Sequence, residues 1–208
     1  LAGNVSALSA SFGLIVDASA PAAPVVASVS TDTATAGDGI TSDNQLDING
    51  TAEAGTSVAI FIDAVQVGTT TTDGGGNWTY DYTGTTLADG AYTVTAQATD
   101  TAENTSAPSA GFSLVVDTAN PAAPSITNVT DDNGVAGDGN TNDTQLEISG
   151  TAEANATVEV FPDAASLGTV SADGSGNWSF GPTANLADGT YNYSAIAQDL
   201  AGNTSALS

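Results

Sequence analysis

The stretch Leu87-Ala88-Asp89-Gly90-Ala91-Tyr92-Thr93-Val94-Thr95-Ala96-Gln97-Ala98 decides the fold class of this chain. It opens with an Asp-Gly turn and continues as a run in which apolar residues alternate with threonine and glutamine. A period of two residues is typical of a β-strand with one buried face. The pattern predicts a strand over Ala91–Ala98. Tyr92 follows the turn directly and is either a tyrosine corner or a half-buried aromatic of the strand.

The same stretch returns further along the chain as Leu186–Ala197, LADGTYNYSAIA, in which Leu186 lies 99 positions after Leu87. Other strings return at a displacement of 100: Asp17 and Asp117 each begin an Asp-x-x-x-Pro-Ala-Ala-Pro string. Repeats of this length match the size of one small β-sandwich domain. The chain is therefore predicted to contain tandem copies of one domain.

Runs of alternating apolar residues are separated by turn clusters that contain most of the 23 glycines and 7 prolines. In the first repeat this pattern predicts strands near residues 25–29, 45–50, 57–62, 67–72, 77–83, 91–98 and 110–116. About seven short antiparallel strands suit a sandwich of two sheets. We therefore predict an all-β fold of tandem Ig-like antiparallel β-sandwich domains joined by short linkers, with Trp78 and Trp178 as core anchors.

The ends of the sequence do not coincide with the boundaries of the repeats. Leu1-Ala2-Gly3-Asn4 corresponds to Leu200-Ala201-Gly202-Asn203. Residues 1–17 are expected to carry the final strand of a preceding repeat. Residues 18–117 are expected to form a complete Ig-like domain, and residues 118–208 an Ig-like domain without its last strand.

The side chains carry charge of one sign only, since the sequence contains 24 Asp and Glu residues and no Lys, Arg or His. The net charge of −24 comes without an imidazole base, an amine or a guanidinium group, and no cysteine supplies a thiolate. These absences remove most of the catalytic repertoire, so we expect no enzyme. Nucleic acid and anionic membranes are bound mainly through basic side chains and are excluded as partners. Hard carboxylate oxygens suit calcium, which we expect as the cofactor.

Five strings carry a resemblance to a known family: Val-Val-Asp-Thr-x-x-Pro-Ala-Ala-Pro, Gly-Thr-Ala-Glu-Ala, Asp-Gly-x-Gly-Asn-Trp, Leu-Ala-Asp-Gly-x-Tyr and Ala-x-Asp-x-Ala-x-Asn-Thr-Ser. Because it contains these five strings in this order, the chain resembles the bacterial Ig-like repeats of giant surface adhesins and biofilm-associated proteins. The resemblance implies a secreted, extracellular stalk at the bacterial cell surface, stiffened by calcium at its domain junctions. Its partners would be neighbouring repeats or identical chains placed head to tail. The absence of Lys and Arg departs from the family pattern.

Sandwich geometry indicates which acidic residues can meet. The linker enters a domain at the end that also bears the B-to-C and F-to-G loops. Three carboxylates there, with carbonyls and water, make a plausible calcium shell of about 6 to 8 oxygens. The two predicted junction sites consist of Asp17, Glu53 and Asp100, and of Asp117, Glu153 and Asp199. Each acid alone is more often a turn former or a solvated surface charge than a metal ligand.

A second set of acids lies in the loop between strands A and B, where glycines permit tight curvature. The loop acids are Asp32, Asp38 and Asp43, with Asp132, Asp138 and Asp143 in the next repeat. Their spacing differs from an EF-hand. The loop predicts either a second calcium site or a plain Asp-Gly turn.

The leading function is a structural spacer in an adhesin or surface fibre that serves cell adhesion or biofilm formation. One alternative is a filament built by strand donation, because residues 10–16 repeat the apolar positions of residues 110–116. Another is a carbohydrate-binding β-sandwich module. An acid-only glycosidase is disfavoured, because both repeats carry the same acids in turns.

Overall fold

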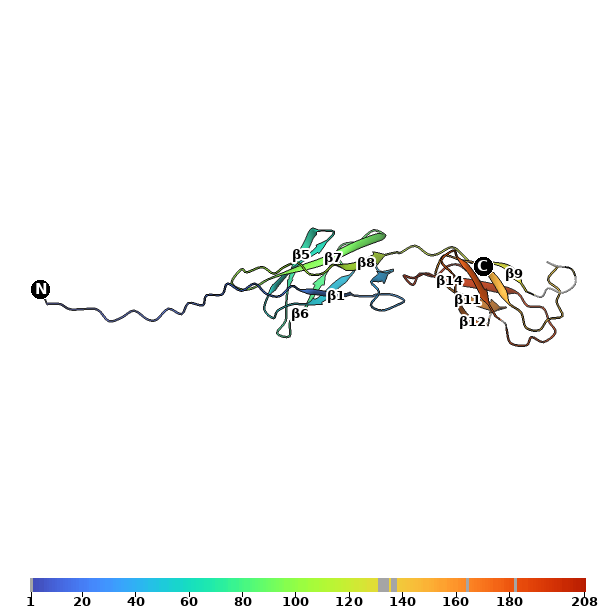
Figure 1. The fold of residues 1–208 in the computed structure, drawn as a ribbon, viewed down its shortest axis with the longest axis horizontal. Helices are drawn as coiled ribbons and strands as arrows, with labels where there is room; N and C mark the ends of the chain where they lie inside the picture. The colour runs from blue at the N-terminus through green and yellow to red at the C-terminus, as the bar shows by residue number, and fades with distance from the viewer. Residues whose placement is uncertain (1, 131–134, 136–137, 164, 182) are drawn as a thin grey trace.

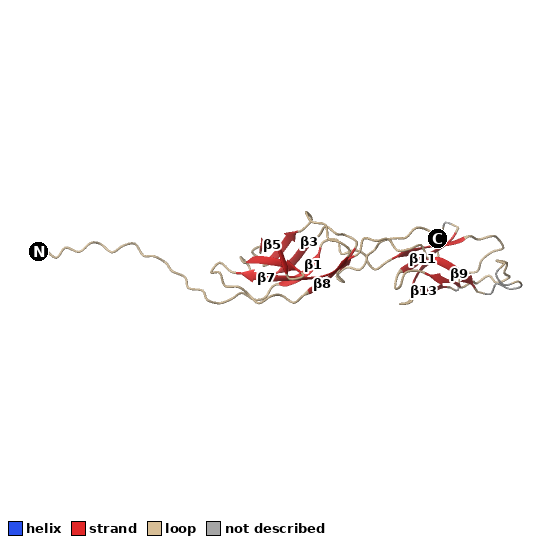
Figure 2. Cartoon of the chain, turned by 90° about the horizontal axis from the view of Figure 1, so that it is seen from above, coloured by secondary structure: helices blue, strands red, loops and turns tan. Residues whose placement is uncertain are grey.

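The computed structural model describes residues 2–130, 135, 138–163, 165–181 and 183–208. Every regular element in these ranges is a β-strand, as Figure 2 shows. None of these residues belongs to a helix that could cross a membrane. The predicted all-β class is confirmed. Two sandwiches follow one another along the long axis of the molecule, and the N-terminal segment extends away from the first sandwich on the side opposite the second (Figure 1).

The first sandwich consists of two sheets that face each other. One sheet has the strand order β1-β3-β6, and the other has the order β2-β8-β7-β4-β5. All neighbouring strands are antiparallel except β2 and β8, which run parallel. The strands are β1 (Val25–Val29), β2 (Ile40–Thr41), β3 (Asp47–Thr51), β4 (Ser57–Ile62), β5 (Val65–Thr71), β6 (Asn77–Asp81), β7 (Gly90–Thr99) and β8 (Phe112–Val116).

The second sandwich repeats this arrangement with two three-stranded sheets among the described residues. Their strand orders are β13-β10-β9 and β12-β11-β14. The strands are β9 (Ser125–Val129), β10 (Ile148–Thr151), β11 (Thr157–Pro162), β12 (Gly168–Ser171), β13 (Asn177–Phe180) and β14 (Tyr193–Gln198). The described part of this sandwich provides no counterpart of β2 or β8, so one edge of β14 has no neighbouring strand.

Alternation along the strands builds the core. Val58 and Ile60 on β4, and Val94 and Ala96 on β7, are fully buried between the sheets, while the residues between them are partly exposed. Successive side chains of a strand point to opposite faces, so apolar residues at every second position form one continuous layer. The period-two pattern therefore places the core correctly.

Each sandwich contains a tryptophan that packs over a glycine. Trp78 on β6 pairs with Gly50 on β3, and Trp178 pairs with Gly150 in the same way. A Cβ atom added at Gly50 would overlap both the Trp78 ring and the backbone carbonyl of Val25. Both tryptophans are 3% exposed, which confirms that they are core anchors.

The tyrosine after the Leu-Ala-Asp-Gly turn adopts the tyrosine-corner geometry. The hydroxyl of Tyr92 donates to the carbonyl oxygen of Ala88 at 2.8 Å, and Tyr191 donates to Ala187 at 3.0 Å. Such a bond ties the start of strand F to the preceding turn. Of the two readings open at Tyr92, the corner is therefore the one found.

Two features of the fold differ from the expected strand pattern. The short strand β2 was not predicted, because its two residues show no periodicity and it exists only as a parallel neighbour of β8. Residues 2–24 form no strand, and the apolar side chains of residues 5–16 are exposed. A strand requires a neighbour to complete its hydrogen-bond ladder, and no described strand pairs with this segment. The assignment of residues 1–17 to the final strand of a preceding repeat stays a prediction.

Candidate functional site at the domain junction

The F-to-G turn of each sandwich is shaped by an aspartate and by an asparagine four residues later. Asp100 Oδ1 accepts the backbone N–H groups of Ala102 at 2.8 Å and Asn104 at 2.9 Å. The Asn104 side-chain amide donates to Asp100 Oδ2 at 2.9 Å. This amide, with the backbone donors, lowers the pKa of Asp100, because hydrogen bonds to a carboxylate favour its charged form.

The same asparagine also holds the segment that leads into its sandwich. Asn203 Nδ2 donates to Asp199 Oδ2 and to the backbone carbonyl of Asp117, both at 2.8 Å. At the first sandwich Asn104 Nδ2 donates to the carbonyl of Asp17 at 3.2 Å. One amide thus closes the F-to-G turn and clamps the incoming chain. We call this arrangement the asparagine clamp.

The linker is also fastened to the sandwich that it leaves. Asp89 Oδ1 accepts the backbone N–H of Thr118 at 3.0 Å and its hydroxyl at 2.9 Å. Asp89 belongs to the Leu-Ala-Asp-Gly turn of the first sandwich, so Asp117 and Thr118 are held from both sides. These two linker residues are therefore bonded to the sandwiches rather than free to move.

A direct contact between the two sandwiches completes the junction. The hydroxyl of Thr33, in the A-to-B loop of the first sandwich, donates to the carbonyl of Ala201 in the F-to-G turn of the second. Gly202 lies against the same loop, since a Cβ atom at this position would come within 3.5 Å of Thr33 and Ala34. The A-to-B loop, which sequence reasoning treated as a separate site, thus belongs to the junction.

The predicted junction acids are only partly brought together. Asn203 links Asp199 to the backbone of Asp117. The corresponding acids Glu53 and Glu153 are exposed, and their backbone carbonyls close the B-to-C turns by accepting from residues 56 and 156. Within the described ranges, no three acidic side chains lie close enough together to hold a metal ion. Calcium coordination by either junction set stays a prediction.

The loop acids support the turn reading. Asp38 Oδ1 accepts the N–H of Ile40 at 2.9 Å, and Asp43 Oδ1 accepts that of Gln45 at 3.0 Å. Asp138 and Asp143 make the corresponding bonds to residues 140 and 145. Such local bonds are the usual reason for aspartate in turns. Asp132 lies outside the described residues.

Asp32 is the exception among the loop acids. One oxygen, Oδ2, accepts the N–H of Gly37, whereas the other, Oδ1, is buried and has no hydrogen-bond partner among the described residues. A buried carboxylate oxygen without a partner is costly unless a cation neutralises it. The next residue, Thr33, contacts the second sandwich, so Asp32 is adjacent in sequence to a residue of the junction.

Sequence reasoning missed Asn104, Asn203, Asp89 and Thr33. The signal available was the recurrence of Asp-x-x-x-Asn within Ala-x-Asp-x-Ala-x-Asn-Thr-Ser. The same spacing also builds the turns at Asp73 and Asp173, whose Oδ1 atoms accept from Asn77 and Asn177. The spacing therefore indicates a closed turn, and only the fold shows which turns face a linker.

Replacing Asn203 with alanine is expected to loosen the junction without unfolding either sandwich. The change removes the bond to Asp117 and one bond to Asp199, each of which contributes about 1 kcal/mol. Distances between spin labels, one on each sandwich, should spread over a wider range in Asn203→Ala.

The matched control for this prediction is Asn104→Ala, which removes the same clamp at the first sandwich and should leave the distance between the sandwiches unchanged. An unaltered distance distribution in Asn203→Ala would show that the clamp does not restrain the junction.

The sequence profile of the bacterial Ig-like domain family matches residues 19–118 and again residues 120–208. The chain belongs to this family of bacterial Ig-like domains, which confirms the fold class and the predicted kind of repeat. The family assignment depends on this profile match. A comparison with curated proteins gives no significant match.

Among solved structures, the chain is similar to fibronectin(III)-like modules of Clostridium thermocellum CbhA, with 19% identity over 86% of this chain and 90% of that chain and a TM-score of 0.47. It is similar to a 1.5-MDa bacterial ice-binding adhesin, with 22% identity over 89% and 62% of the two chains and a TM-score of 0.40. A Ca²⁺-stabilized adhesin of an Antarctic bacterium that binds ice gives 26% identity over 89% and 47%, with a TM-score of 0.36. The chain spans less than two thirds of either adhesin structure.

Proposed function

We propose that this chain is a section of an extracellular stalk, in which tandem Ig-like domains hold an adhesive part of a bacterial surface protein away from the cell. The observation that carries the proposal is the asparagine clamp, which recurs at the entry of both sandwiches. A spacer requires each domain to restrain the chain that enters it. The clamp and the Asp89 bonds hold the short linker itself, and the Thr33 contact joins the two sandwiches directly.

The two tryptophans argue against the carbohydrate-binding alternative. Sugar-binding surfaces present flat aromatic rings to the ligand, whereas Trp78 and Trp178 are buried in the cores. A stalk section should therefore bind no glycan on an array at micromolar concentration. Small-angle scattering should give a maximum dimension that corresponds to two sandwiches end to end. Specific glycan binding, or a folded-back pair of sandwiches, would contradict the proposal.

Calcium is proposed as the ion that rigidifies this junction. Support comes from a net charge of −24 without any basic side chain, and from the buried, unpartnered Oδ1 of Asp32. Carboxylate and carbonyl oxygens are the ligands that calcium prefers. Asp117, Glu153 and Asp199 form no three-acid cluster in the described structure, so their side chains would have to turn toward the ion to supply its charged oxygens.

Calcium is expected to raise the melting temperature of the chain above its value in EDTA. An ion that binds only the folded state stabilises it by RT ln(1 + [L]/Kd), on the order of 2.7 kcal/mol at a hundredfold excess over Kd. Calorimetry in EDTA, in millimolar calcium and in equal magnesium measures the effect. Magnesium should give a smaller shift, because it keeps its own water shell.

The variants Asp117→Ala and Glu153→Ala should lose the calcium-dependent shift and keep the circular dichroism of the strands. Glu159→Ala is the matched control, because Glu159 lies on β11 and its carboxylate accepts from Ser166 rather than from the junction. Equal melting temperatures with calcium and EDTA in the unaltered chain would refute the calcium proposal. The stalk proposal would still stand on its scattering test.

A further inference from the structure

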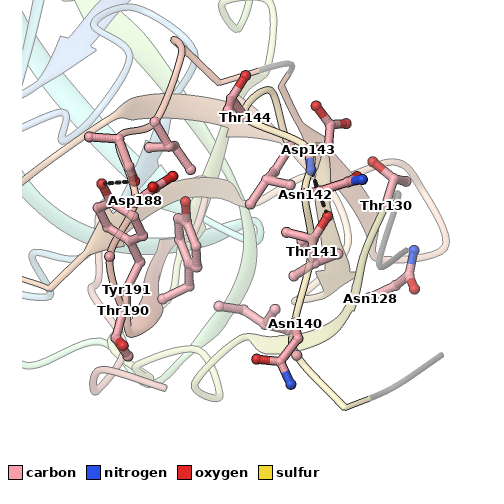
Figure 3. Close-up of a pocket in the computed structure, with 18 of the residues that line it drawn as sticks. Asn128, Thr130, Asn140, Thr141, Asn142, Asp143, Thr144, Asp188, Thr190 and Tyr191 are labelled. Carbon is pink, nitrogen blue, oxygen red and sulfur yellow. Dashed lines mark hydrogen bonds between the residues drawn. The ribbon is translucent and has the colours of Figure 1, made fainter. Parts of the chain in front are cut away.

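The A-to-B loop and the Leu-Ala-Asp-Gly turn lie at the same end of each sandwich. In the first sandwich this end faces the second sandwich, since Asp89 bonds to the linker and Thr33 to the next F-to-G turn. In the second sandwich the same two loops lie together, with Asn140 and Thr141 across a pocket from Tyr191 (Figure 3). Both repeats therefore present the A-to-B loop at the end that is opposite their F-to-G turn.

The contact between the A-to-B loop and the next F-to-G turn consists of one hydrogen bond and one close approach. The Thr33 hydroxyl donates to the carbonyl of Ala201, and its oxygen accepts the N–H of Ser42 at 2.9 Å, which fixes it within the loop. Gly202 provides the close approach, because a Cβ atom there would lie 3.5 Å from Thr33 and from the backbone nitrogen of Ala34. A methyl group fits at this distance, whereas a longer side chain would meet the loop. We call this contact, between residues 33–34 and residues 201–202, the loop seat.

The two F-to-G turns share the residues of the asparagine clamp but differ at the loop seat. Asn104 and Asn203 make the same bonds to the aspartate of the turn and to the incoming chain. The residue before the asparagine is Gly202 in the second turn and Glu103 in the first, with φ angles of +90° and +70°. Glycine adopts this backbone freely, whereas glutamate adopts it at an energetic cost. Since the turn also forms with glycine, the backbone of the turn does not require the glutamate.

The loop side of the seat also differs between the repeats. Thr33-Ala34 corresponds in sequence to Asn133-Gly134, which lies outside the described residues. A negative charge at the seat would have no basic side chain to neutralise it, because the chain contains no Lys, Arg or His. Asp32, the residue before Thr33, already has a buried carboxylate oxygen without a partner among the described residues. This loop would therefore repel a glutamate that faces it, in addition to leaving it little space.

We propose that the residue at this position of the F-to-G turn determines how tightly a sandwich docks on the sandwich before it. Glycine lets the preceding A-to-B loop close on the turn, as it does at Gly202. Glutamate, as at Glu103, keeps such a loop away and leaves the junction to bonds with the linker. The clamp is common to both turns, and the loop seat is specific to one of them. This assignment rests on the proposed stalk function and explains how its stiffness can differ from one junction to the next.

Distances between two spin labels test the proposal in the full chain. The chain contains no cysteine, and Thr69→Cys on β5 and Thr169→Cys on β12 place one exposed label on each sandwich. Gly202→Glu should widen the distance distribution about twofold, because a junction that loses a contact populates more orientations. Gly202→Ala should keep the narrow distribution, because a Cβ atom fits in ordinary contact and Glu103 shows that the turn accepts a residue other than glycine. EDTA in every sample separates this result from the calcium test.

The matched control is Glu103→Gly, which makes the reverse exchange at the entry of the first sandwich and should leave the distribution unchanged. Identical distributions for Gly202→Glu and the unaltered chain would overturn the proposal. Equal widening by Gly202→Ala and Gly202→Glu would also overturn it, because the effect would then come from backbone strain. Neither result would affect the scattering test of the stalk, which depends on the end-to-end order of the sandwiches.

Variants on the loop side test the seat even if a glutamate disturbs the turn. Thr33→Val keeps the shape of the side chain but cannot donate to Ala201, so it should also widen the distribution, whereas Thr33→Ser keeps the hydroxyl and should not. Thr33→Val combined with Gly202→Glu should widen the distribution no further than Gly202→Glu alone, because both changes remove one contact. Fully additive widening, or equal distributions for Thr33→Val and Thr33→Ser, would contradict the proposal. Circular dichroism of each variant checks that both sandwiches remain folded.

Discussion

Replacing Gly50 with alanine is expected to lower the free energy of unfolding of the first sandwich by about 3 kcal/mol or more, because overpacking a filled core forces neighbours out of place. The added Cβ atom would overlap the backbone carbonyl of Val25 on β1 as well as the ring of Trp78. A flexible side chain can turn aside, whereas a paired strand cannot move without breaking its ladder. Urea unfolding followed by tryptophan fluorescence measures the change. In a Trp178→Phe background, Trp78 alone reports on the first sandwich.

The control for this prediction is Gly74→Ala in the same background. No atom lies within 4 Å of a Cβ atom at Gly74, so the unfolding midpoint should stay in place. A normal midpoint for Gly50→Ala would mean that β1 and β6 can separate at little cost, and that the glycine is not required for their packing.

Replacing Leu114 with alanine is expected to cost about 3 kcal/mol, within the range found for buried leucines that leave a cavity. Leu114 is fully buried on β8, next to the core residues of β7. Leu14 stands at the same place in the same sequence pattern but is exposed. Leu14→Ala should therefore leave the unfolding curve of the dilute, monomeric chain unchanged. Urea denaturation of both variants, at a concentration where light scattering shows only monomer, makes the comparison.

An equal loss of stability in both variants would contradict this expectation. It would show that residues 10–16 are buried somewhere in the folded chain.

Most strands could be predicted because a local sequence pattern specifies each of them. Residues 25–29 and 57–62 were expected as strands with the bounds that the structure has. Alternating apolar residues, with Gly and Asp at the ends of each run, specify a half-buried strand without knowledge of its neighbours. The bounds of the other predicted strands shifted by no more than two residues, as at β6, which ends at Asp81 rather than continuing to residue 83.

The candidate site could be predicted only in outline. The sequence indicated which acids face the linker, but the bond from Asn203 to Asp117 joins residues 86 positions apart, and the bond from Thr33 to Ala201 joins residues 168 positions apart. Nothing in a local pattern relates such residues, because the contact depends on how one sandwich follows the other. The A-to-B loop was therefore assigned to a separate site, although its Thr33 belongs to the junction.

The sequence by itself determined the class of fold, the repeat and the inward face of most strands, since these follow from period-two alternation and turn chemistry. Only the tertiary structure decided which of those strands form. The patterns Phe12-x-Leu14-x-Val16 and Phe112-x-Leu114-x-Val116 are the same, yet the second is a buried strand and the first is unpaired and exposed. The physical reason is that a strand is stabilised by its neighbours. The hydrogen bonds and the apolar cover that hold β8 come from β2 and β7, and residues 12–16 have neither.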